Sequence, residues 1–145
     1  MSTNNASALW TGTLKEGRGE MRFTNFNGPF TFSSRFEDGS ETNPEELVGA
    51  AHAGCYSMFL SALISGAGLT PASIETKATI SLEKDDVGPN ITNITLDCNV
   101  ECDGLSHEKF EELTAAAKAK CPISRLYEGG TANIELNATL VVASN

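Results

Sequence analysis

The chain has 145 residues, 40% of them hydrophobic, with a formal net charge of −9 and an isoelectric point of about 4.6. This length fits one compact domain over residues 1–145, with a core that needs no structural disulfide. Nucleic acids and anionic membrane surfaces attract basic faces, so the acidic charge argues against both partners. The N-terminus MSTNNASALW shows no signal-peptide pattern, which predicts a cytoplasmic protein with reduced thiols.

The first third of the chain is predicted to be β-structure. Three short segments, 8–14, 19–25 and 28–36, are rich in aromatic and β-branched residues and are separated by Gly and Asn. The dipeptide Asn27-Gly28 is typical of a tight hairpin turn. We therefore expect these strands to pair as hairpins, with one turn at this dipeptide.

A long helix is predicted for residues 44–65. Asn43 suits the N-cap, Pro44 the first helical position and Glu46 the third, while Gly66 follows the end. The segment is apolar on nearly every side, which is typical of a buried helix. It is long enough to cross a membrane, but it contains Ser, Gly and His and lacks basic flanks and an aromatic belt, which argues against a span.

The rest of the chain alternates strands with a second helix. Apolar and polar residues alternate in 74–84, 91–102 and 131–142. A helix is predicted for 107–120, with Ser106 as its N-cap, and a short helical turn is predicted to begin at Pro122. The resulting order, βββ-α-ββ-α-β, predicts an α+β fold in which antiparallel sheets surround the long buried central helix.

The four cysteines are Cys55, Cys98, Cys102 and Cys121, and no two of them form a CxxC motif. The spacing therefore indicates neither a zinc ribbon nor a thioredoxin-type site. Cys98 and Cys102 lie on the apolar face of one predicted strand, which favours small core residues. Four residues of a strand span roughly 13 Å, and disulfide-bonded Cα atoms lie within about 7 Å, so these two cannot form a disulfide.

Cys55 and Cys121 leave more possibilities open. Cys55 lies mid-helix, as a buried apolar thiol would, and His52 precedes it on nearly the same face. His52 could act as a base or metal ligand, although a packed, hydrogen-bonded histidine is favoured; the other histidine, His107, offers no visible metal site. Cys121 precedes Pro122 and, as the N-cap of a short helical turn, would meet backbone N–H groups that favour a thiolate.

Two motifs connect these residues. The block SRFEDGSETNPEELVGAAHAGCYSMFLSALI at 34–64 is followed far downstream by CPIS at 121–124. Together with the order of strands and helices, they resemble the OsmC/Ohr family of osmotically inducible and organic hydroperoxide resistance proteins. The resemblance covers almost the whole chain. The position of SRF just before the long helix is closer to the OsmC branch than to the Ohr branch, whose arginine lies further upstream.

The resemblance implies a thiol-dependent peroxidase in oxidative and osmotic stress defence, acting on organic hydroperoxides and less well on hydrogen peroxide. By motif, Cys55 is the peroxidatic thiol, Cys121 resolves it, and Arg35 and Glu45 assist. The family fold is an intertwined homodimer with two active sites at its interface. The implied reductant is a dithiol, either small or a lipoyl group on a partner protein, and no metal, flavin or haem is implied.

The chemistry of the motif residues supports these roles. A thiolate attacks the peroxide, and burial mid-helix would raise the pKa of Cys55, so a nearby cation is needed. Arg35 can supply this cation, because one opposite charge shifts a pKa by about 1–3 units. Glu45 would hold the Arg35 guanidinium in place. Ten helical residues separate Glu45 from Cys55, roughly 15 Å along the axis. We therefore expect Arg35 and Glu45 of one subunit to face Cys55 of the other.

Two other interpretations stay open. The small residues at 49–54 could line a pocket or a dimer contact in a non-enzymatic small-molecule or lipid binder. A structural stress protein with inert cysteines would instead show slow, equal labelling of all four thiols. Cys98, Cys102 and Arg125 have no role in the family pattern.

Overall fold

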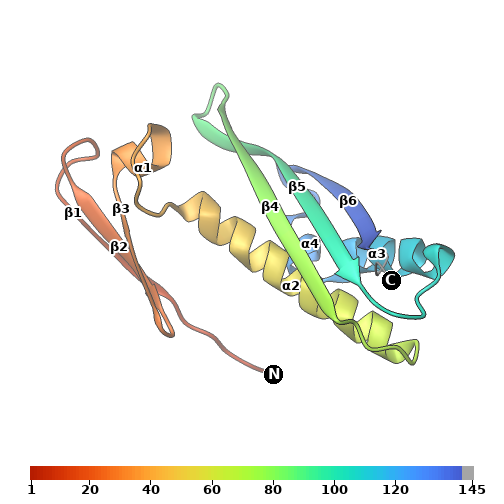
Figure 1. Ribbon diagram of the computed structural model, residues 1–145. Coiled ribbons are helices and arrows are strands. Elements are labelled where there is room, and N and C mark those ends of the chain that lie inside the picture. The colour runs from red at the N-terminus through yellow and green to blue at the C-terminus, as the bar shows by residue number, and fades with distance from the viewer. Residues whose placement is uncertain (142–145) are drawn as a thin grey trace. The chain divides into compact units, whose positions relative to one another are not determined.

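The structure is a computed structural model, and it describes residues 1–141. The chain folds as two compact units, Met1–Leu47 and Val48–Asn145. In chain order the elements are β1 (Ser7–Thr11), β2 (Arg18–Phe23), β3 (Phe26–Phe30), α1 (Phe32–Phe36), α2 (Pro44–Gly66), β4 (Ser73–Lys84), β5 (Pro89–Glu101), α3 (His107–Lys120), α4 (Pro122–Tyr127) and β6 (Asn133–Val141) (Figure 1). The α+β class is confirmed, and a single domain over the whole chain stays a prediction.

The first unit contains an antiparallel sheet in the order β1-β2-β3. Gly19 in β2 pairs with Trp10 on one side and Phe30 on the other. The two aromatic rings pack with centroids 5.3 Å apart. A Cβ atom at Gly19 would come within 2.6 Å of both rings, so only glycine fits between them.

The hairpin turn lies earlier than predicted. Asn27 and Gly28 belong to β3, and the turn joining β2 to β3 is formed by Thr24 and Asn25. Asn25 takes the left-handed conformation, with φ of 58°, which asparagine tolerates better than most residues. Gly28 serves a different purpose, because a Cβ atom there would lie 2.6 Å from the Phe26 ring.

The predicted strand at 28–36 is wrong in its second half. β3 ends at Phe30, and α1 begins directly after Thr31. Thr31 and Ser34 form a capping box: the Ser34 N–H donates to the Thr31 hydroxyl at 3.1 Å, and the Thr31 N–H donates to the Ser34 hydroxyl at 2.9 Å. This local exchange of hydrogen bonds favours a helical turn over further extension, and it places Arg35 on a helix.

Helix α2 begins at Pro44 as predicted and ends at Gly66, one residue later than predicted. Asn43 is its N-cap, accepting from the Glu46 N–H at 2.8 Å. It has the length and composition of a membrane-spanning helix. One stripe of it is nevertheless fully buried in the core of the second unit: His52, Tyr56, Leu60 and Ile64.

The prediction that α2 is buried on nearly every side is wrong for the single chain. Ala50, Ala51, Gly54 and Met58 are exposed on its other side, with Met58 at 80%. Apolar composition alone does not distinguish a helix covered by its own chain from one whose second face is left for a partner.

The second unit contains a sheet in the order β4-β5-β6. β4 and β5 pair antiparallel as predicted, but β5 and β6 are parallel, from Asn93↔Asn133 to Glu101↔Val141. The expectation of purely antiparallel sheets is therefore wrong here. The crossover through α3 and α4 returns the chain to the starting end of β5, and a strand entering from that end must run parallel. Residue 142 of the predicted last strand lies outside the described residues.

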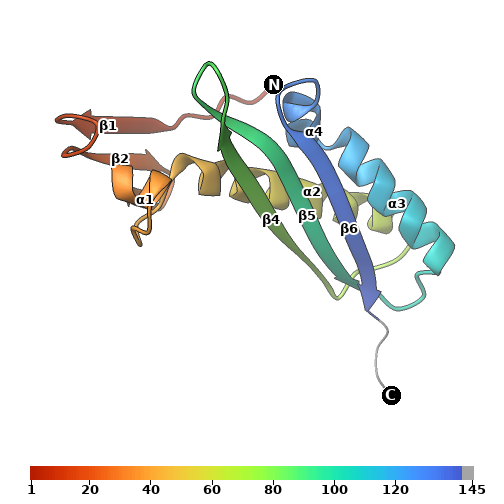
Figure 2. The ribbon, with the colours of Figure 1, turned by 90° about the horizontal axis from the view of Figure 1, so that it is seen from above.

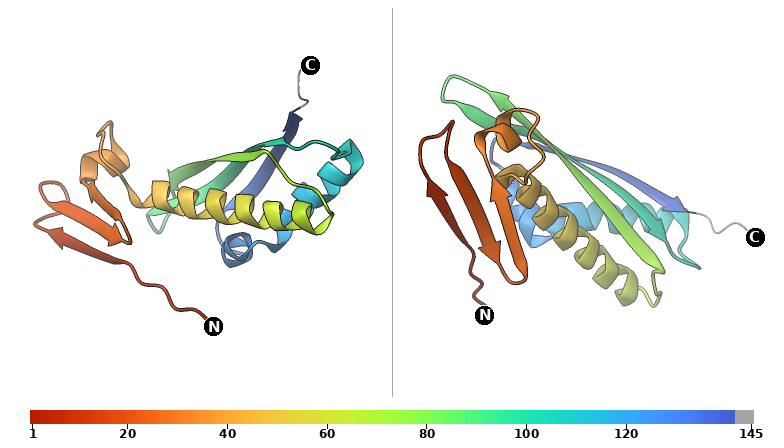
Figure 3. Two further views of the ribbon diagram at one scale, coloured as in Figure 1. Left: turned by 60° about the horizontal axis from the view of Figure 1, so that its bottom comes forward. Right: turned by 60° about the vertical axis from the view of Figure 1, so that its left-hand side comes forward.

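The helices of this unit lie on one face of the sheet (Figure 2, Figure 3). Alternate residues of β5 point toward them and are buried: Ile94, Leu96, Cys98 and Val100. From α3, Phe110, Leu113 and Ala117 complete the core, as their helical spacing requires. Cys98 and Cys102 are both buried and reduced, which confirms their prediction as core residues.

Replacing Leu96 with alanine should lower the free energy of unfolding by about 2–5 kcal/mol, because its fully buried side chain would leave a cavity. Urea unfolding of the reduced protein measures this change. Leu140→Ala is the matched control in the neighbouring strand, where the side chain is only partly buried. An equal loss in both variants would contradict the core described here.

Candidate active site

Arg35 and Glu45 form a tight ion pair within the first unit. The Arg35 Nη2 and Nε atoms donate to Glu45 Oε1 at 2.8 and 3.1 Å, and Nε also reaches Oε2 at 3.3 Å. The Glu45 side chain is 11% exposed and that of Arg35 37%. A guanidinium held at two of its nitrogens by a buried carboxylate has a fixed orientation. Its remaining N–H groups can therefore point toward a ligand.

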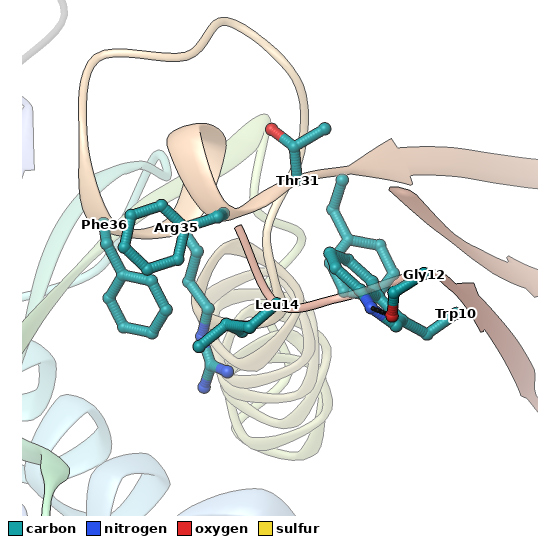
Figure 4. Close-up of a pocket in the computed structure, with 8 residues that line it drawn as sticks. Trp10, Gly12, Leu14, Thr31, Arg35 and Phe36 are labelled. Atoms are coloured by element: carbon teal, nitrogen blue, oxygen red, sulfur yellow. Dashed lines mark hydrogen bonds between the residues drawn. The ribbon is translucent and has the colours of Figure 1, made fainter. Parts of the chain in front are cut away.

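An apolar pocket of about 470 Å³ lies beside Arg35 (Figure 4). It is lined by Trp10, Gly12, Leu14, Phe30, Thr31, Phe32, Arg35 and Phe36. The guanidinium carbon of Arg35 also lies 5.2 Å from the centre of the Phe36 ring. Among the lining residues the sequence motifs identified Arg35, and the aromatic residues of β1 and α1 were the available signal for the apolar ones.

Cys55 lies on α2 in the second unit and is partly exposed. Burial raises the pKa of its thiol, the N–H of Ile123 acts in the opposite direction, and the Cys121 side chain raises the pKa further. These influences require short distances, so the structure brings Cys55 together with the CPIS segment. Both thiols are reduced.

Cys121 is fully buried where α3 meets α4. Its N–H donates to the Ala117 carbonyl at 3.0 Å, ending α3, and its sulfur accepts from the Ser124 N–H at 3.4 Å, starting α4. Pro122 occupies the first turn of α4. The prediction of Cys121 as an N-cap is confirmed. Its thiol also donates to the Ser124 hydroxyl at 3.0 Å, a contact that sequence reasoning missed.

His52 is fully buried and hydrogen-bonded, as favoured from the sequence. Its Nε2 lies 2.7 Å from the Ser124 hydroxyl. The Tyr127 ring meets the imidazole edge-on, with centroids 5.3 Å apart at 86°. Burial lowers the pKa of His52, so the ring is neutral at pH 7. Among residues 1–141, no three His, Cys, Asp or Glu side chains cluster as metal ligands do.

The four motif residues therefore form two pairs, Arg35 with Glu45 in the first unit and Cys55 with Cys121 in the second. A fixed cation and a thiol beside a second thiol are the components of cysteine redox chemistry. Arg125 is exposed on α4 and joins neither pair.

Comparisons with known proteins agree with this architecture. The family described as OsmC-like protein matches residues 37–137. The chain is 43% identical over 122 residues to "Peroxiredoxin OsmC" of Escherichia coli K12, covering 82% of this chain and 85% of that one. It is 30% identical over 103 residues to "Organic hydroperoxide resistance protein-like 2" of Staphylococcus epidermidis, covering 71% of each.

Solved structures share the fold. An OsmC-like protein from Mycoplasma pneumoniae superposes with a TM-score of 0.78 at 16% identity, covering 97% of this chain and 99% of the other. An organic hydroperoxide resistance protein of Bacillus subtilis gives 0.69 at 24% identity, covering 94% and 98%. The chain belongs to the OsmC-like family, and the resemblance noted in its motifs is confirmed.

Proposed function

We propose that this protein is a cysteine-based peroxidase that reduces organic hydroperoxides, and less well hydrogen peroxide, in stress defence. One observation carries the proposal: a partly exposed thiol, Cys55, lies beside a buried second thiol, Cys121, in a chain 43% identical to a protein named as a peroxiredoxin. We place it in the cytoplasm, where thiols stay reduced unless they are catalytic.

The proposed cycle has three steps. The Cys55 thiolate attacks the terminal peroxide oxygen, the O–O bond breaks, and the alkoxide takes a proton from solvent and leaves as the alcohol, so that Cys55 becomes a sulfenic acid. The Cys121 sulfur then attacks the Cys55 sulfur; an S–S bond forms and the hydroxyl leaves as water. An external dithiol, either small or a lipoyl group on a partner protein, reduces the disulfide by exchange.

The first step requires a cation that offsets the effect of burial. Burial raises the pKa of Cys55 and so lowers its thiolate fraction at neutral pH. We assign that cation to Arg35, held by Glu45. Because Glu45 and Cys55 are ten residues apart on one helix, we propose a homodimer in which Arg35 of one subunit serves Cys55 of the other. The exposed small side chains of α2 would pack in its interface.

The pocket beside Arg35 favours substrates with apolar tails. Its lining is largely aromatic and aliphatic, with one guanidinium at its edge. An alkyl or aryl hydroperoxide could place its tail among these side chains and its oxygens against the arginine donors. Hydrogen peroxide has no tail to bind, which accounts for the lower expected activity.

Disulfide mapping tests the proposal directly. Reduced protein treated with one equivalent of cumene hydroperoxide should yield a Cys55–Cys121 disulfide by mass spectrometry, because these two thiols adjoin. Cys98 and Cys102 serve as internal controls and should stay reduced, since both are buried in the core. If all four thiols stay reduced, the peroxidase proposal fails and a non-enzymatic binder using the apolar pocket takes its place.

A further inference from the structure

A buried chain of hydrogen bonds runs from the resolving thiol, Cys121, through Ser124 to His52, whose ring has Ser124 as its one hydrogen-bond partner among residues 1–141. The Cys121 thiol donates to the Ser124 hydroxyl at 3.0 Å, and that hydroxyl lies 2.7 Å from His52 Nε2. Ser124 is 2% exposed, and Cys121 and His52 are fully buried. The hydrogen bonds in such a chain, shielded from water, polarise one another, so that a change of protonation at one end is coupled to the other end.

The two ring nitrogens of His52 have different surroundings. Nδ1 is buried and has no hydrogen-bond partner among the described residues. Since the Ser124 oxygen already accepts from Cys121, its own hydrogen is free to be donated to Nε2. For the chain to pass a proton to His52, Nε2 must be the acceptor and Nδ1 must carry the ring proton. An orphaned buried N–H is costly, so the tautomer of His52 is a decisive test of this arrangement.

We propose that Ser124 and His52 form a proton relay for Cys121 in the disulfide-forming and disulfide-breaking steps. The proposal rests on the proposed peroxidase function and extends it to two residues outside the four motif positions. Ser124 touches the reacting sulfur, and His52 acts through Ser124. Neither residue touches the peroxide.

In the forward direction the relay removes the proton that the resolving thiol must lose. As the Cys121 sulfur attacks the Cys55 sulfenic sulfur, the thiol proton passes to the Ser124 oxygen and the Ser124 proton passes to His52 Nε2. The hydroxide leaving the partly exposed Cys55 takes a proton from solvent and becomes water, while the proton taken from Cys121 stays on His52 for the reduction step.

In the reverse direction the relay protonates a leaving group. Cys55 is partly exposed whereas Cys121 is fully buried, so an external dithiol reaches the Cys55 sulfur. Cys121 then departs as a thiolate, and a proton returned from His52 through Ser124 makes it a better leaving group. Because Cys121 is fully buried, the relay gives the proton a route that does not pass through bulk water.

The surroundings of His52 keep it available as an acceptor. Tyr127 of α4 meets the ring edge-on, and Cys121 faces it through Ser124. On its own helix, Cys55 and Tyr56 lie three and four residues away. Burial alone lowers the pKa of His52 below the ordinary value of 6.5, with no contribution from a charged side chain. The unprotonated ring therefore predominates above that pH.

The tautomer of His52 can be observed in the reduced wild-type protein. Long-range proton–nitrogen correlation spectra of a ¹⁵N-histidine-labelled sample should show a neutral ring protonated on Nδ1. The chain has two histidines, and exposed His107 is assigned by its loss in His107→Gln. A ring protonated on Nε2 would overturn the proposal, because that nitrogen could not accept from Ser124.

Rapid-quench kinetics test the relay in each step separately. Ser124→Ala removes the bridging hydroxyl, and His52→Gln keeps a group that can bond to Ser124 but has no basic nitrogen. Oxidation of Cys55 by cumene hydroperoxide, followed with a sulfenic-acid trap, should stay within about twofold of wild type in both variants. Formation of the Cys55–Cys121 disulfide should slow at least about tenfold in both, because proton transfer is lost.

Ser57→Ala is the matched control. Its hydroxyl is partly buried and bonds to the Thr76 hydroxyl at 2.7 Å, away from the relay. Both steps should be unchanged in it. Disulfide formation within twofold of wild type in either relay variant refutes the relay while leaving the peroxidase intact. Absence of both sulfenic acid and disulfide in the wild type refutes the proposed function instead.

Discussion

Replacing Cys55 with serine is expected to reduce the turnover of cumene hydroperoxide by at least about 10³-fold, to near the rate of the dithiol alone. A serine hydroxyl is not ionised at neutral pH and is a poor nucleophile toward a peroxide oxygen. The partly exposed thiol of Cys55 is the group that the substrate would reach first. Hydroperoxide consumption with a small dithiol as reductant measures the effect.

Two further cysteine variants test whether the loss of the first oxidation is specific to Cys55. Cys121→Ser should complete one oxidation, leaving a trappable sulfenic acid on Cys55, and then turn over poorly because no disulfide forms. Cys102→Ser should keep its activity within about twofold, because a hydroxyl can replace the weak donation of its thiol to the Thr70 carbonyl. Activity retained in Cys55→Ser would mean that another thiol reacts with the peroxide.

Replacing Arg35 with alanine is expected to slow the first oxidation by about 10²-fold, since one opposite charge is worth about 1–3 pKa units. Burial raises the pKa of Cys55 above its ordinary value of 9.0, and a nearby cation lowers it. On the proposed assignment, the loss of Arg35 removes that cation while burial and the Cys121 side chain still raise the pKa of Cys55, so the thiolate fraction at neutral pH falls. Alkylation of Cys55 as a function of pH, read by mass spectrometry, should shift to higher pH in the variant.

Arg18→Ala is the control for a general loss of positive charge in the first unit. Arg18 pairs with Glu41 at 2.9 Å, but its side chain is 63% exposed and outside the motif. Its loss should leave both the alkylation profile and the oxidation rate unchanged. An unaltered pH profile in Arg35→Ala would show that some other group ionises Cys55.

Features set by local sequence were predictable. The N-caps at Asn43 and Ser106 fixed where two helices begin, because a side-chain oxygen and the N–H three residues on are neighbours in any helix. The cap at Cys121 followed from the proline after it. Within the first unit, the pairing of Arg35 with Glu45 was also anticipated, although from a family motif and not from the spacing.

Features decided by competing local signals or by distant contacts were not predictable. The turn at Asn25 competed with a stronger turn signal two residues later, and stacking of Phe23 on Phe26, with centroids 4.5 Å apart, accompanies the observed pairing. Ser124 gave no signal of its own, because its bond to His52 joins residues 72 apart in the chain. Single-sequence periodicity carries no information about such partners.

The parallel pairing of β5 with β6 has a consequence for how the protein is made. Each paired residue lies 40 positions from its partner, as Asn93 and Asn133 do. Loop closure over such a distance is slow, so on an emerging chain one edge of β5 stays open until the last strand has been synthesised. An open edge with apolar residues invites association with other chains. Helix α3 can form in the meantime from local contacts, and its early docking on the apolar face of β5 would protect the nascent chain.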